Sequence, residues 1–261
     1  MPELPEVETY RSYLAHTALH KTIIGVEADF ENYGRIFEAS KLELASLEGE
    51  SFEEAFRHGK YCLLEATSER VLVLHFGMTG CVKYYKKGDS DPEHSAMVFS
   101  FQDGHKLAII SVRKFGKVIL AEGREEFIEM QGLGPDALSL DEEGFVEIMG
   151  AKRGRIKSAL MDQKTISGIG NIYSDEILYH AGIKPDKKVI DMGMADLEIV
   201  YEKMIFVLNT AVENDADSRK MPENYLMMRR EEGASCGICG GKIKNIKIGG
   251  RSAYFCPRHQ K

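Results

Sequence analysis

The segment KYCLLEATSERVLVLHFGMTGCVKYYK (residues 60–86) determines the fold expected for the first half of the chain. It alternates short runs of β-branched and aromatic residues with turn residues, and this pattern continues to about residue 120. Such runs are typical of β-strands. Strands are expected at residues 60–66, 71–76, 81–86, 96–101 and 106–111. Several short strands at near-regular spacing predict a β-sandwich or barrel.

The sequence changes character after about residue 121, where apolar residues recur at helical spacing. Helices are expected at residues 125–130, 141–149, 155–163, 171–183 and 194–213. The segment SGIGN (167–171) interrupts two of them. Its glycines permit a tight backbone approach, and the helix that follows is expected to present free N–H groups to a phosphate. Glycines also occur in ordinary turns, so the segment alone does not identify a binding site.

Charge is distributed unevenly along the chain, although the formal net charge is −7. Residues 121–150 contain nine acidic residues and one basic residue, whereas residues 233–261 contain six basic residues and no acidic one. Residues 151–157 add four more bases. A local basic surface can bind phosphates whatever the total charge. A single charge run is usually a solvated surface, but the long basic segment favours a nucleic-acid partner.

The apolar content and the first residues of the chain argue against a membrane protein or a secreted protein. No apolar run approaches the ~20 residues that span a bilayer. The N-terminal MPELPEVETY is acidic and lacks the basic start and apolar core of a signal peptide. We therefore expect an intracellular, cytoplasmic protein without membrane association.

These patterns predict an α+β multidomain chain. The expected parts are a β domain at 1–121, an acidic linking segment at 122–150, a helical domain at 151–232 and a metal-bound appendix at 233–261.

Two closely spaced ligand pairs mark the C-terminal appendix. Cys236 and Cys239 are separated by two residues, and after sixteen residues Cys256 and His259 repeat that spacing. This pattern indicates zinc. Four protein ligands form a closed shell, so we expect one structural zinc ion rather than a catalytic one. The alternative is three free thiols and an unrelated histidine.

Pro2 becomes the chain terminus if the initiator methionine is removed. An α-amino group titrates at ~8, against ~10.4 for a lysine side chain, so more of it is neutral near pH 7. A neutral amine can attack a sugar carbon and form an iminium, and the neighbouring Glu3 can move protons at the sugar ring. The same residues also favour an ordinary helix start, so Pro2 and Glu3 alone leave both interpretations open.

Six motifs together resemble those of the formamidopyrimidine-DNA glycosylase / endonuclease VIII family, closer to the formamidopyrimidine branch. They are MPELPEVE (1–8), HGKYCLLE (58–65), HFGMTG (75–80), VRKFG (112–116), IKSALMDQ…SGIGNIYSDEIL (156–178) and GGRSAYFCPRHQ (249–260). The resemblance implies an N-terminal β-sandwich flanked by helices, then a helix–two-turns–helix domain with a zinc-finger hairpin. It also implies a bifunctional DNA glycosylase and abasic-site lyase of base excision repair, acting as a monomer on damaged double-stranded DNA.

The resemblance assigns catalytic roles to four matched positions. Pro2 would be the Schiff-base nucleophile and Glu3 its partner acid and base. Lys60 would contact the phosphates near the lesion and assist β-elimination, although a lone lysine is more often solvated. Arg251, in the zinc hairpin, would bind a phosphate and support δ-elimination.

The resemblance also assigns residues that bind DNA. Met78, Arg113 and Phe115 would fill the gap left by an extruded nucleotide, as wedges that offset part of the unstacking cost. Without the resemblance, Met78 and Phe115 would be predicted as core residues. The other matched DNA-binding positions are His94, Lys152, Lys157 and Asn171. The candidate acids at the lesion site are Glu6 and Glu176.

The sequence departs from the family pattern at three places, one in the zinc site and two in regions that bear on substrate choice. His259 stands where the formamidopyrimidine branch usually has a cysteine, and the wedge motif reads SVRKFG instead of Asp-Pro-Arg-Arg-Phe-Gly. The segment 211–235 looks shortened and lacks the usual Thr-Thr-Leu-Arg motif of the lesion-covering loop. Such a loop contacts the flipped base and so determines which base is accepted. We therefore expect the protein to accept formamidopyrimidines, 8-oxoguanine and oxidised pyrimidines, with a weaker preference for 8-oxoguanine.

Two other functions compete with this interpretation. A non-catalytic zinc-containing DNA-binding protein could use the same DNA-contacting elements, and a zinc-ribbon RNA-binding module would explain the C-terminal segment. A pure binder does not need Pro2, Glu3 and Lys60 together. Their joint presence favours the enzyme.

Overall fold

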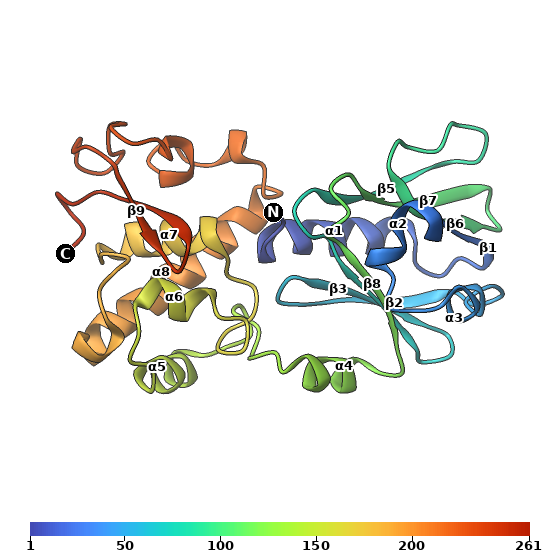
Figure 1. The fold of residues 1–261 in the computed structure, drawn as a ribbon, viewed down its shortest axis with the longest axis horizontal. Coiled ribbons are helices and arrows are strands. Elements are labelled where there is room, and N and C mark those ends of the chain that lie inside the picture. Colours follow the sequence, from blue (N-terminus) through green and yellow to red (C-terminus); the bar gives the residue numbers. More distant parts are fainter. The chain divides into compact units, whose positions relative to one another are not determined.

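The computed structural model describes residues 1–261, and the chain folds into two compact units. Unit 1 comprises Met1–Pro2 and Glu6–Gly132, and unit 2 comprises Glu3–Pro5 and Leu133–Lys261. The first helix, α1 (Leu4–Thr17), therefore begins in unit 2 and continues in unit 1. Figure 1 shows strands predominating in unit 1, and helices with a C-terminal hairpin in unit 2. This confirms the predicted α+β multidomain fold.

Unit 1 contains two four-stranded antiparallel sheets. The first has the order β1 (Ile23–Ala28), β6 (Ser95–Phe101), β7 (His105–Ser111) and β5 (Gly80–Lys86). The second has the order β2 (Phe52–His58), β3 (Tyr61–Ala66), β4 (Val71–His75) and β8 (Lys117–Ala121). The predicted strands are confirmed, and β1, β2 and β8 complete the sheets.

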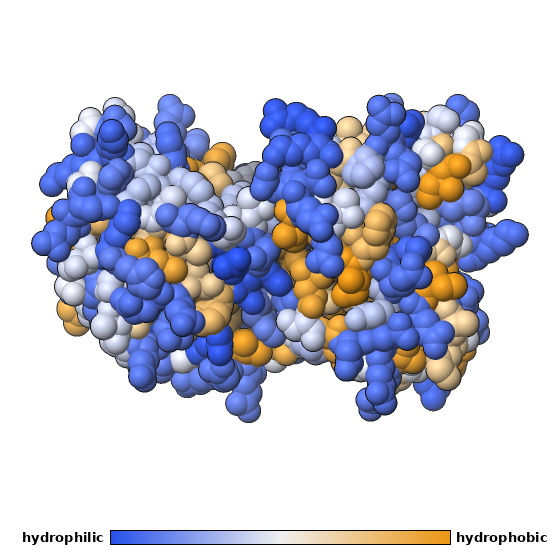
Figure 2. Space-filling model, turned by 180° about the vertical axis from the view of Figure 1, so that it is seen from behind, coloured by the Kyte–Doolittle hydropathy of each residue, from blue (hydrophilic) through white to orange (hydrophobic).

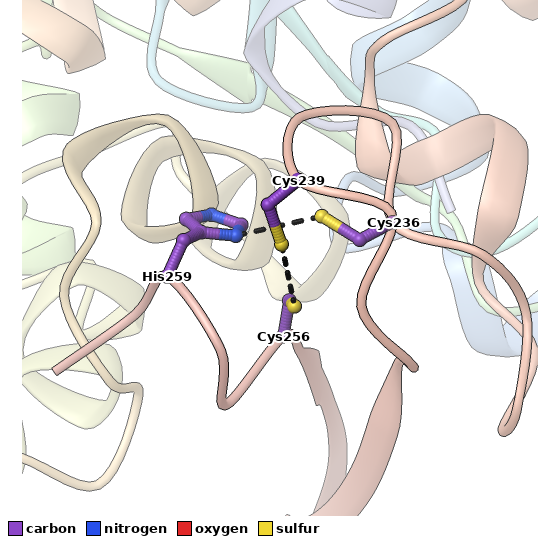
Figure 3. Close-up of side chains that lie close together, drawn as sticks. All are labelled: Cys236, Cys239, Cys256 and His259. Atoms are coloured by element: carbon purple, nitrogen blue, oxygen red, sulfur yellow. Dashed lines mark hydrogen bonds between the residues drawn. The ribbon is translucent and has the colours of Figure 1, made fainter.

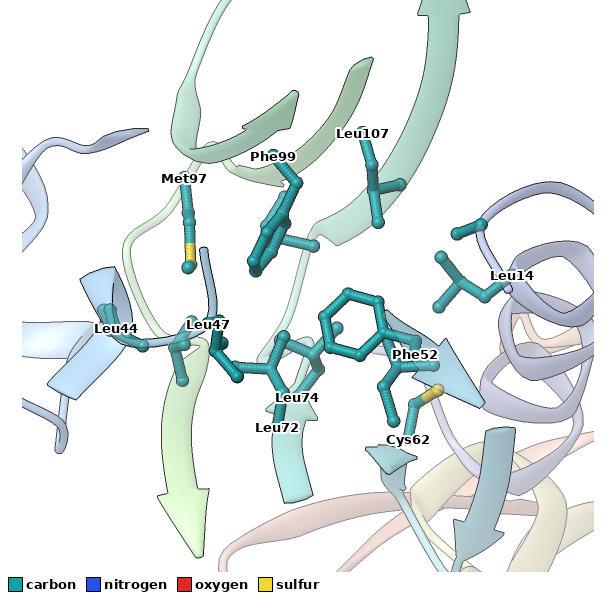
Figure 4. Packing of buried hydrophobic residues seen from close by; sticks show 14 of the residues in the cluster. Leu14, Leu44, Leu47, Phe52, Cys62, Leu72, Leu74, Met97, Phe99 and Leu107 are labelled. Carbon is teal, nitrogen blue, oxygen red and sulfur yellow. The ribbon is translucent and has the colours of Figure 1, made fainter. Parts of the chain in front are cut away.

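The core of unit 1 is formed by side chains from both sheets (Figure 4). Alternate residues of a strand face the same side, and Phe52 of β2 meets Phe99 of β6 edge to face, with ring centroids 5.4 Å apart. Leu14 of α1 joins the same cluster. Each large apolar side chain buried in this way contributes about 1.5–3 kcal/mol. The shared core confirms the β-sandwich.

Short helical elements complete unit 1: α2 (Phe30–Tyr33), η1 (Gly34–Ile36), α3 (Lys41–Ala45) and α4 (Arg124–Gln131). A capping box starts α3, because Ser40 and Glu43 each accept a hydrogen bond from the backbone N–H of the other. Helix α4 ends at Gly132, whose φ of 60° lies in the left-handed region.

Unit 2 is mainly helical. Its helices are α5 (Glu142–Gly150), α6 (Ile156–Met161), α7 (Asn171–Ala181), the short η2 (Val189–Asp191) and α8 (Met194–Glu213). The four α-helices confirm the helical periodicity of this half, and α8 has the predicted limits. Ile177 of α7 and Met204 of α8 belong to one buried cluster. Leu4, from the start of the chain, is buried in the same cluster.

The chain after α8 folds compactly before it reaches the zinc-finger segment. It forms η3 (Ser218–Lys220) and η4 (Leu226–Arg229), and it buries Met221, Tyr225 and Leu226. The shortened segment is therefore anchored in unit 2 by its own apolar side chains.

A β-hairpin follows, formed by β9 (Lys244–Ile248) and β10 (Arg251–Phe255). Gly249 and Gly250 join the strands with φ values of 56° and 77°. A two-residue turn with both φ values positive matches the twist of a hairpin and favours glycine. The hairpin predicted between the two ligand pairs is confirmed.

On the face drawn in Figure 2, hydrophobic side chains form small patches among hydrophilic residues. None of the helices has the length and apolar character required to cross a bilayer.

Candidate functional site

The carboxylate of Glu3 is buried in unit 2, where 1% of the residue is exposed. Its oxygens accept hydrogen bonds from the backbone N–H groups of Gly170 (2.7 Å), Ile172 (2.9 Å) and Tyr173 (3.3 Å). These donors lie at the N-terminus of α7, where the unpaired N–H groups and the helix dipole favour a negative charge. The position of Glu3 is therefore fixed by a helix that lies more than 160 residues further along the chain.

The glycines of SGIGN make room for the first residues of the chain. A Cβ atom on Gly170 would lie 2.3 Å from Cδ of Glu3, and one on Gly168 would lie 2.6 Å from a methyl carbon of Leu4. Gly168 also has a φ of 115°, and its carbonyl accepts a hydrogen bond from Leu4 N at 3.0 Å. The prediction that this turn offers free N–H groups to a phosphate is wrong for the three donors above, because a carboxylate of the chain itself occupies them.

Pro2 is bonded to Glu3 and is buried, whereas Met1 is 44% exposed. The secondary amine of Pro2 forms only when Met1 is removed, and Met1 is accessible to solvent. The next acid, Glu6, is partly buried in the first turn of α1.

Lys60 is buried in unit 1, with 7% of the residue exposed. It lies in the turn between β2 and β3, next to Gly59, whose φ is 56°. The alternative of a solvated strand lysine is therefore wrong. Burial, and then the nearby charges of Lys60 and Lys117, lower the pKa of His75 to about 4. Neutral His75 accepts a hydrogen bond from Gly77 N at 3.2 Å.

Two loops of unit 1 bring the wedge candidates together. Met78 is 41% exposed and Phe115 is 59% exposed, so neither is a core residue. A Cβ atom on Gly77 would lie 2.4 Å from the backbone of Phe115, which shows how closely the two loops pack. The guanidinium of Arg113 lies 5.5 Å from the centre of the Phe115 ring. His94 is also exposed, and its carbonyl accepts a hydrogen bond from Ser111 N just before the loop.

The DNA-binding candidates of unit 2 differ in exposure. Arg251 is exposed at the start of β10, with a guanidinium nitrogen 3.7 Å from Sδ of Met161. Lys152 and Asn171 are partly buried, and Oδ1 of Asn171 is buried without a hydrogen-bond partner. Lys157 is fully buried, so its ammonium group does not reach the surface in this structure.

The ammonium of Lys157 forms an ion pair with Asp175 on α7. It also donates hydrogen bonds to the carbonyls of Asn171 (3.3 Å) and Ser252 (3.4 Å). Burial, only partly offset by the charge of Asp175, lowers the pKa of Lys157 below its ordinary value. Burial likewise raises the pKa of Asp175, against the effect of Lys157 and Arg230.

Glu176, the second candidate acid at the lesion site, is also buried. Its two oxygens accept hydrogen bonds from the backbone N–H groups of Leu226 and Met227, both at 2.7 Å. His180 lies one helical turn away, with Nε2 at 3.2 Å from the Glu176 carboxylate. Glu176 therefore holds the segment that precedes the zinc finger.

The predicted metal ligands Cys236, Cys239, Cys256 and His259 converge in unit 2 (Figure 3), and their ligand atoms lie within 4.8 Å of one another. Cys236 Sγ lies 3.4 Å from Nδ1 of His259, and Cys239 Sγ lies 3.5 Å from Cys256 Sγ. Three thiols and one imidazole in a cluster of this size fit a tetrahedral zinc ion. The alternative of free thiols and an unrelated histidine is wrong, and the predicted structural zinc site is confirmed.

Tyr179 on α7 supports two of these ligands. Its hydroxyl lies 3.0 Å from Cys236 Sγ, and its carbonyl lies 3.0 Å from Nε2 of His259. The second contact leaves Nδ1 to face the cluster. Partners of this kind orient metal ligands and raise metal affinity.

Sequence reasoning missed three residues that organise unit 2, namely Asp175, Tyr179 and Arg230. Asp175 and Tyr179 lie inside the quoted motif and helix, but Arg230, which pairs with Asp175, and Cys236, which contacts Tyr179, lie more than 50 residues away. Only the adjacency of Asp175 to the candidate Glu176 could have drawn attention to it.

Family models match the chain in three parts. Residues 1–118 match the formamidopyrimidine-DNA glycosylase N-terminal domain, and residues 132–223 match the H2TH domain of that glycosylase. Residues 235–260 match the zinc finger found in FPG and IleRS.

Individual proteins are similar over the whole chain. The formamidopyrimidine-DNA glycosylase of Shouchella clausii is 34% identical, covering 100% of this chain and 99% of the relative. That of Synechocystis sp. is 33% identical, covering 100% and 98%. The crystal structure of the Lactococcus lactis formamidopyrimidine-DNA glycosylase, non-covalently bound to DNA with an abasic site, has a TM-score of 0.88 at 28% identity and 99% coverage of each chain. Full-length matches at this level show that the chain belongs to the formamidopyrimidine-DNA glycosylase family of DNA-repair enzymes.

Proposed function

We propose that the chain is a bifunctional DNA glycosylase and abasic-site lyase that uses the N-terminal amine of Pro2 as its nucleophile. The observation that carries this proposal is the binding of Glu3 by the SGIGN turn and the start of α7. A buried carboxylate with three backbone donors has a fixed position, and the peptide bond places Pro2 beside it. An ordinary helix start needs no such arrangement.

In the proposed reaction the Pro2 nitrogen attacks C1′ of the damaged nucleotide. The glycosidic bond breaks and its electron pair leaves with the base, which takes up a proton. Loss of the amine proton and opening of the sugar give an iminium between Pro2 and C1′. Elimination then expels the 3′ phosphate and afterwards the 5′ phosphate. Glu3 moves protons at the sugar ring.

Lys60 and Arg251 act on the phosphates in this proposal. Lys60 contacts the phosphates near the lesion and assists β-elimination, and the exposed Arg251 grips a phosphate and supports δ-elimination. Both are basic side chains, which suit contact with a phosphodiester.

The exposed wedge residues serve the extrusion of the damaged nucleotide. Met78 and Phe115 enter the space that the nucleotide leaves, and Arg113 faces the orphaned base. The remaining DNA-binding residues are His94, Lys152, Asn171 and Lys157. Lys157 acts from beneath the surface through the carbonyl of Asn171.

The substrates proposed are formamidopyrimidines, 8-oxoguanine and oxidised pyrimidines in double-stranded DNA. Related glycosylases have been crystallised with DNA that contains Fapy-dG or carbocyclic 8-oxo-G, which supports the first two. The segment from Met221 to Arg230 is anchored by apolar side chains and by Glu176. A fixed short segment reads the base less selectively than a longer loop that closes over it, so 8-oxoguanine is not strongly preferred. Glu6 and Glu176 contribute at the lesion site, Glu176 by holding this segment.

A cleavage assay tests the activity. Duplexes that contain one abasic site, one 8-oxoguanine or one oxidised pyrimidine are incubated with the zinc-loaded protein, which we propose is an intracellular monomer. We expect strand cleavage with β,δ-elimination ends and comparable turnover of the base lesions. Binding without cleavage would support the alternative, a non-catalytic zinc-containing DNA-binding protein, and a strong 8-oxoguanine preference would contradict the proposed specificity.

A further inference from the structure

The carboxylate of Asp175 connects three separate segments of unit 2. Its Oδ1 atom pairs with Lys157 of α6. Its Oδ2 atom accepts hydrogen bonds from Arg230, at 2.8 Å, and from the backbone N–H of Tyr254 in β10, at 3.1 Å. Asp175 is 1% exposed, so these contacts are shielded from water.

The two cations that bind Asp175, Lys157 and Arg230, also contact other residues. The Lys157 ammonium also bonds the carbonyls of Asn171 and Ser252, which uses its three hydrogens. The Arg230 guanidinium lies 4.8 Å from the centre of the Tyr254 ring and 3.5 Å from the carbonyl of Asn171. One cluster thus joins the start of α7 to two backbone groups of β10, the carbonyl of Ser252 and the N–H of Tyr254.

The composition of this cluster argues for a positional role. Two cations surround one anion, so the three side chains carry a net positive charge, with Lys157 and Asp175 fully buried and Arg230 partly exposed. Buried ion pairs contribute little to net stability, and a protein often loses no stability when apolar residues replace the whole group. Removing one partner alone, however, strongly destabilises the fold. Directed charge-assisted hydrogen bonds do fix geometry. The geometry fixed here is that of β10, whose first residue is Arg251.

We propose that Asp175 is a positioning residue that holds β10, and with it Arg251, against the end of α7 that binds Glu3. The significance of Arg251 for elimination rests on the proposed function. The attachment of β10 to α7 does not, and it can be measured in the absence of DNA.

The test compares Asp175→Asn with the matched control Asp186→Asn, an exposed acid of the same unit. Amide hydrogen exchange of the zinc-loaded protein reports on Tyr254. In Asp175→Asn we expect its exchange to accelerate on the order of tenfold or more, the equivalent of one hydrogen bond to a charged group. The ratio of δ- to β-elimination product should fall, while covalent trapping on DNA stays within about twofold of the parent protein. The control should match the parent in all three measurements.

Charge compensation separates positioning from general disruption. Asp175→Asn removes the negative charge of the cluster and so raises its net charge by one, and the double variant Asp175→Asn/Arg230→Gln restores the net charge of the parent. We expect the double variant to recover most of the Tyr254 protection and of the δ-product. If Asp175→Asn does not fold, Asp175→Glu keeps the negative charge but displaces the carboxylate from the Tyr254 N–H, and it should still accelerate Tyr254 exchange.

Two results would overturn the proposal: unchanged Tyr254 exchange in the folded variants, or a fall in trapping that equals the fall in δ-product. A parent protein that neither traps nor cleaves DNA would refute the proposed function instead. The exchange data would then still decide whether Asp175 holds the hairpin.

Discussion

The carboxylate of Glu3 and the backbone nitrogen of Gly170 are 2.7 Å apart, although 167 positions separate them in the chain. This hydrogen bond, with those from Ile172 and Tyr173, makes the third residue of the protein part of the unit formed by the C-terminal half. This contact requires glycine at position 170, because the Cβ atom of any other residue would overlap the carboxylate. The SGIGN turn and the N-terminal acid are thus one structural feature.

Gly170→Ala is predicted to displace Glu3. The new methyl group would lie 2.3 Å from Cδ of Glu3, and overpacking of this kind costs about 1–3 kcal/mol. Base removal should fall by roughly a hundredfold, the scale of losing one positioned acid–base group. Thermal unfolding and single-turnover kinetics measure both effects. Gly154→Ala is the control, since nothing lies within 4 Å of its Cβ position. Equal behaviour of the two variants would refute the role of Gly170.

His75 is predicted to make the stability of unit 1 depend on pH. Its pKa falls from 6.5 to about 4 on folding, so the unfolded chain binds its proton at a higher pH than the folded one. The stabilisation from neutral His75 is fully present above about pH 6.5 and is lost as pH falls from there through about 4. Over this range the free energy of unfolding should decrease by up to about 3 kcal/mol. Chemical denaturation across this range should show a smaller loss in His75→Asn than in the exposed control His16→Asn. Parallel curves for both variants would contradict the assignment.

Phe115→Ala is predicted to impair lesion processing without destabilising the fold. The side chain is 59% exposed, so the free energy of unfolding should change by no more than about 0.5 kcal/mol. Excision from duplex DNA should slow by roughly tenfold or more, because an unfilled gap leaves a few kcal/mol of unstacking cost uncompensated. Met130→Ala, at a methionine that is 76% exposed on α4, should retain full excision. Unimpaired excision by Phe115→Ala would exclude it as a wedge.

Tyr179→Phe is predicted to weaken zinc binding. Loss of the hydroxyl removes the contact with Cys236 and should raise the zinc dissociation constant by roughly 10- to 100-fold. Competition with a chromogenic chelator measures this constant without any enzymatic assay. Tyr201→Phe removes a hydroxyl that contacts only the carbonyl of Leu140, and zinc affinity should be unaffected. Equal zinc affinity in both variants would show that Tyr179 does not support the metal site.

The secondary structure was largely predictable because its signals are local. The apolar period of 194–213 gives α8 its limits, and the ligand spacing at Cys236 and His259 predicts the zinc cluster. The side-chain partners were not predictable. Glu3 could be recognised as a candidate acid, but no local pattern indicates that the SGIGN turn binds it rather than a phosphate.

The burial of Lys157 was also not predictable from the sequence. Its basic neighbourhood favours an exposed phosphate contact, yet the structure buries it against Asp175. Which charges become buried depends on how α6, α7 and β10 pack, and that information is spread over segments as distant as residues 157 and 252.

The central claim is that the amine of Pro2 attacks the damaged nucleotide, and borohydride trapping tests it most directly. Protein with a verified Pro2 terminus is incubated with a duplex that contains 8-oxoguanine or an abasic site and is then reduced. Peptide mapping by mass spectrometry locates the adduct. We predict a covalent complex on the N-terminal peptide at Pro2, lost in Pro2→Gly. An adduct on a lysine-containing peptide elsewhere, or no covalent complex at all, would contradict the account.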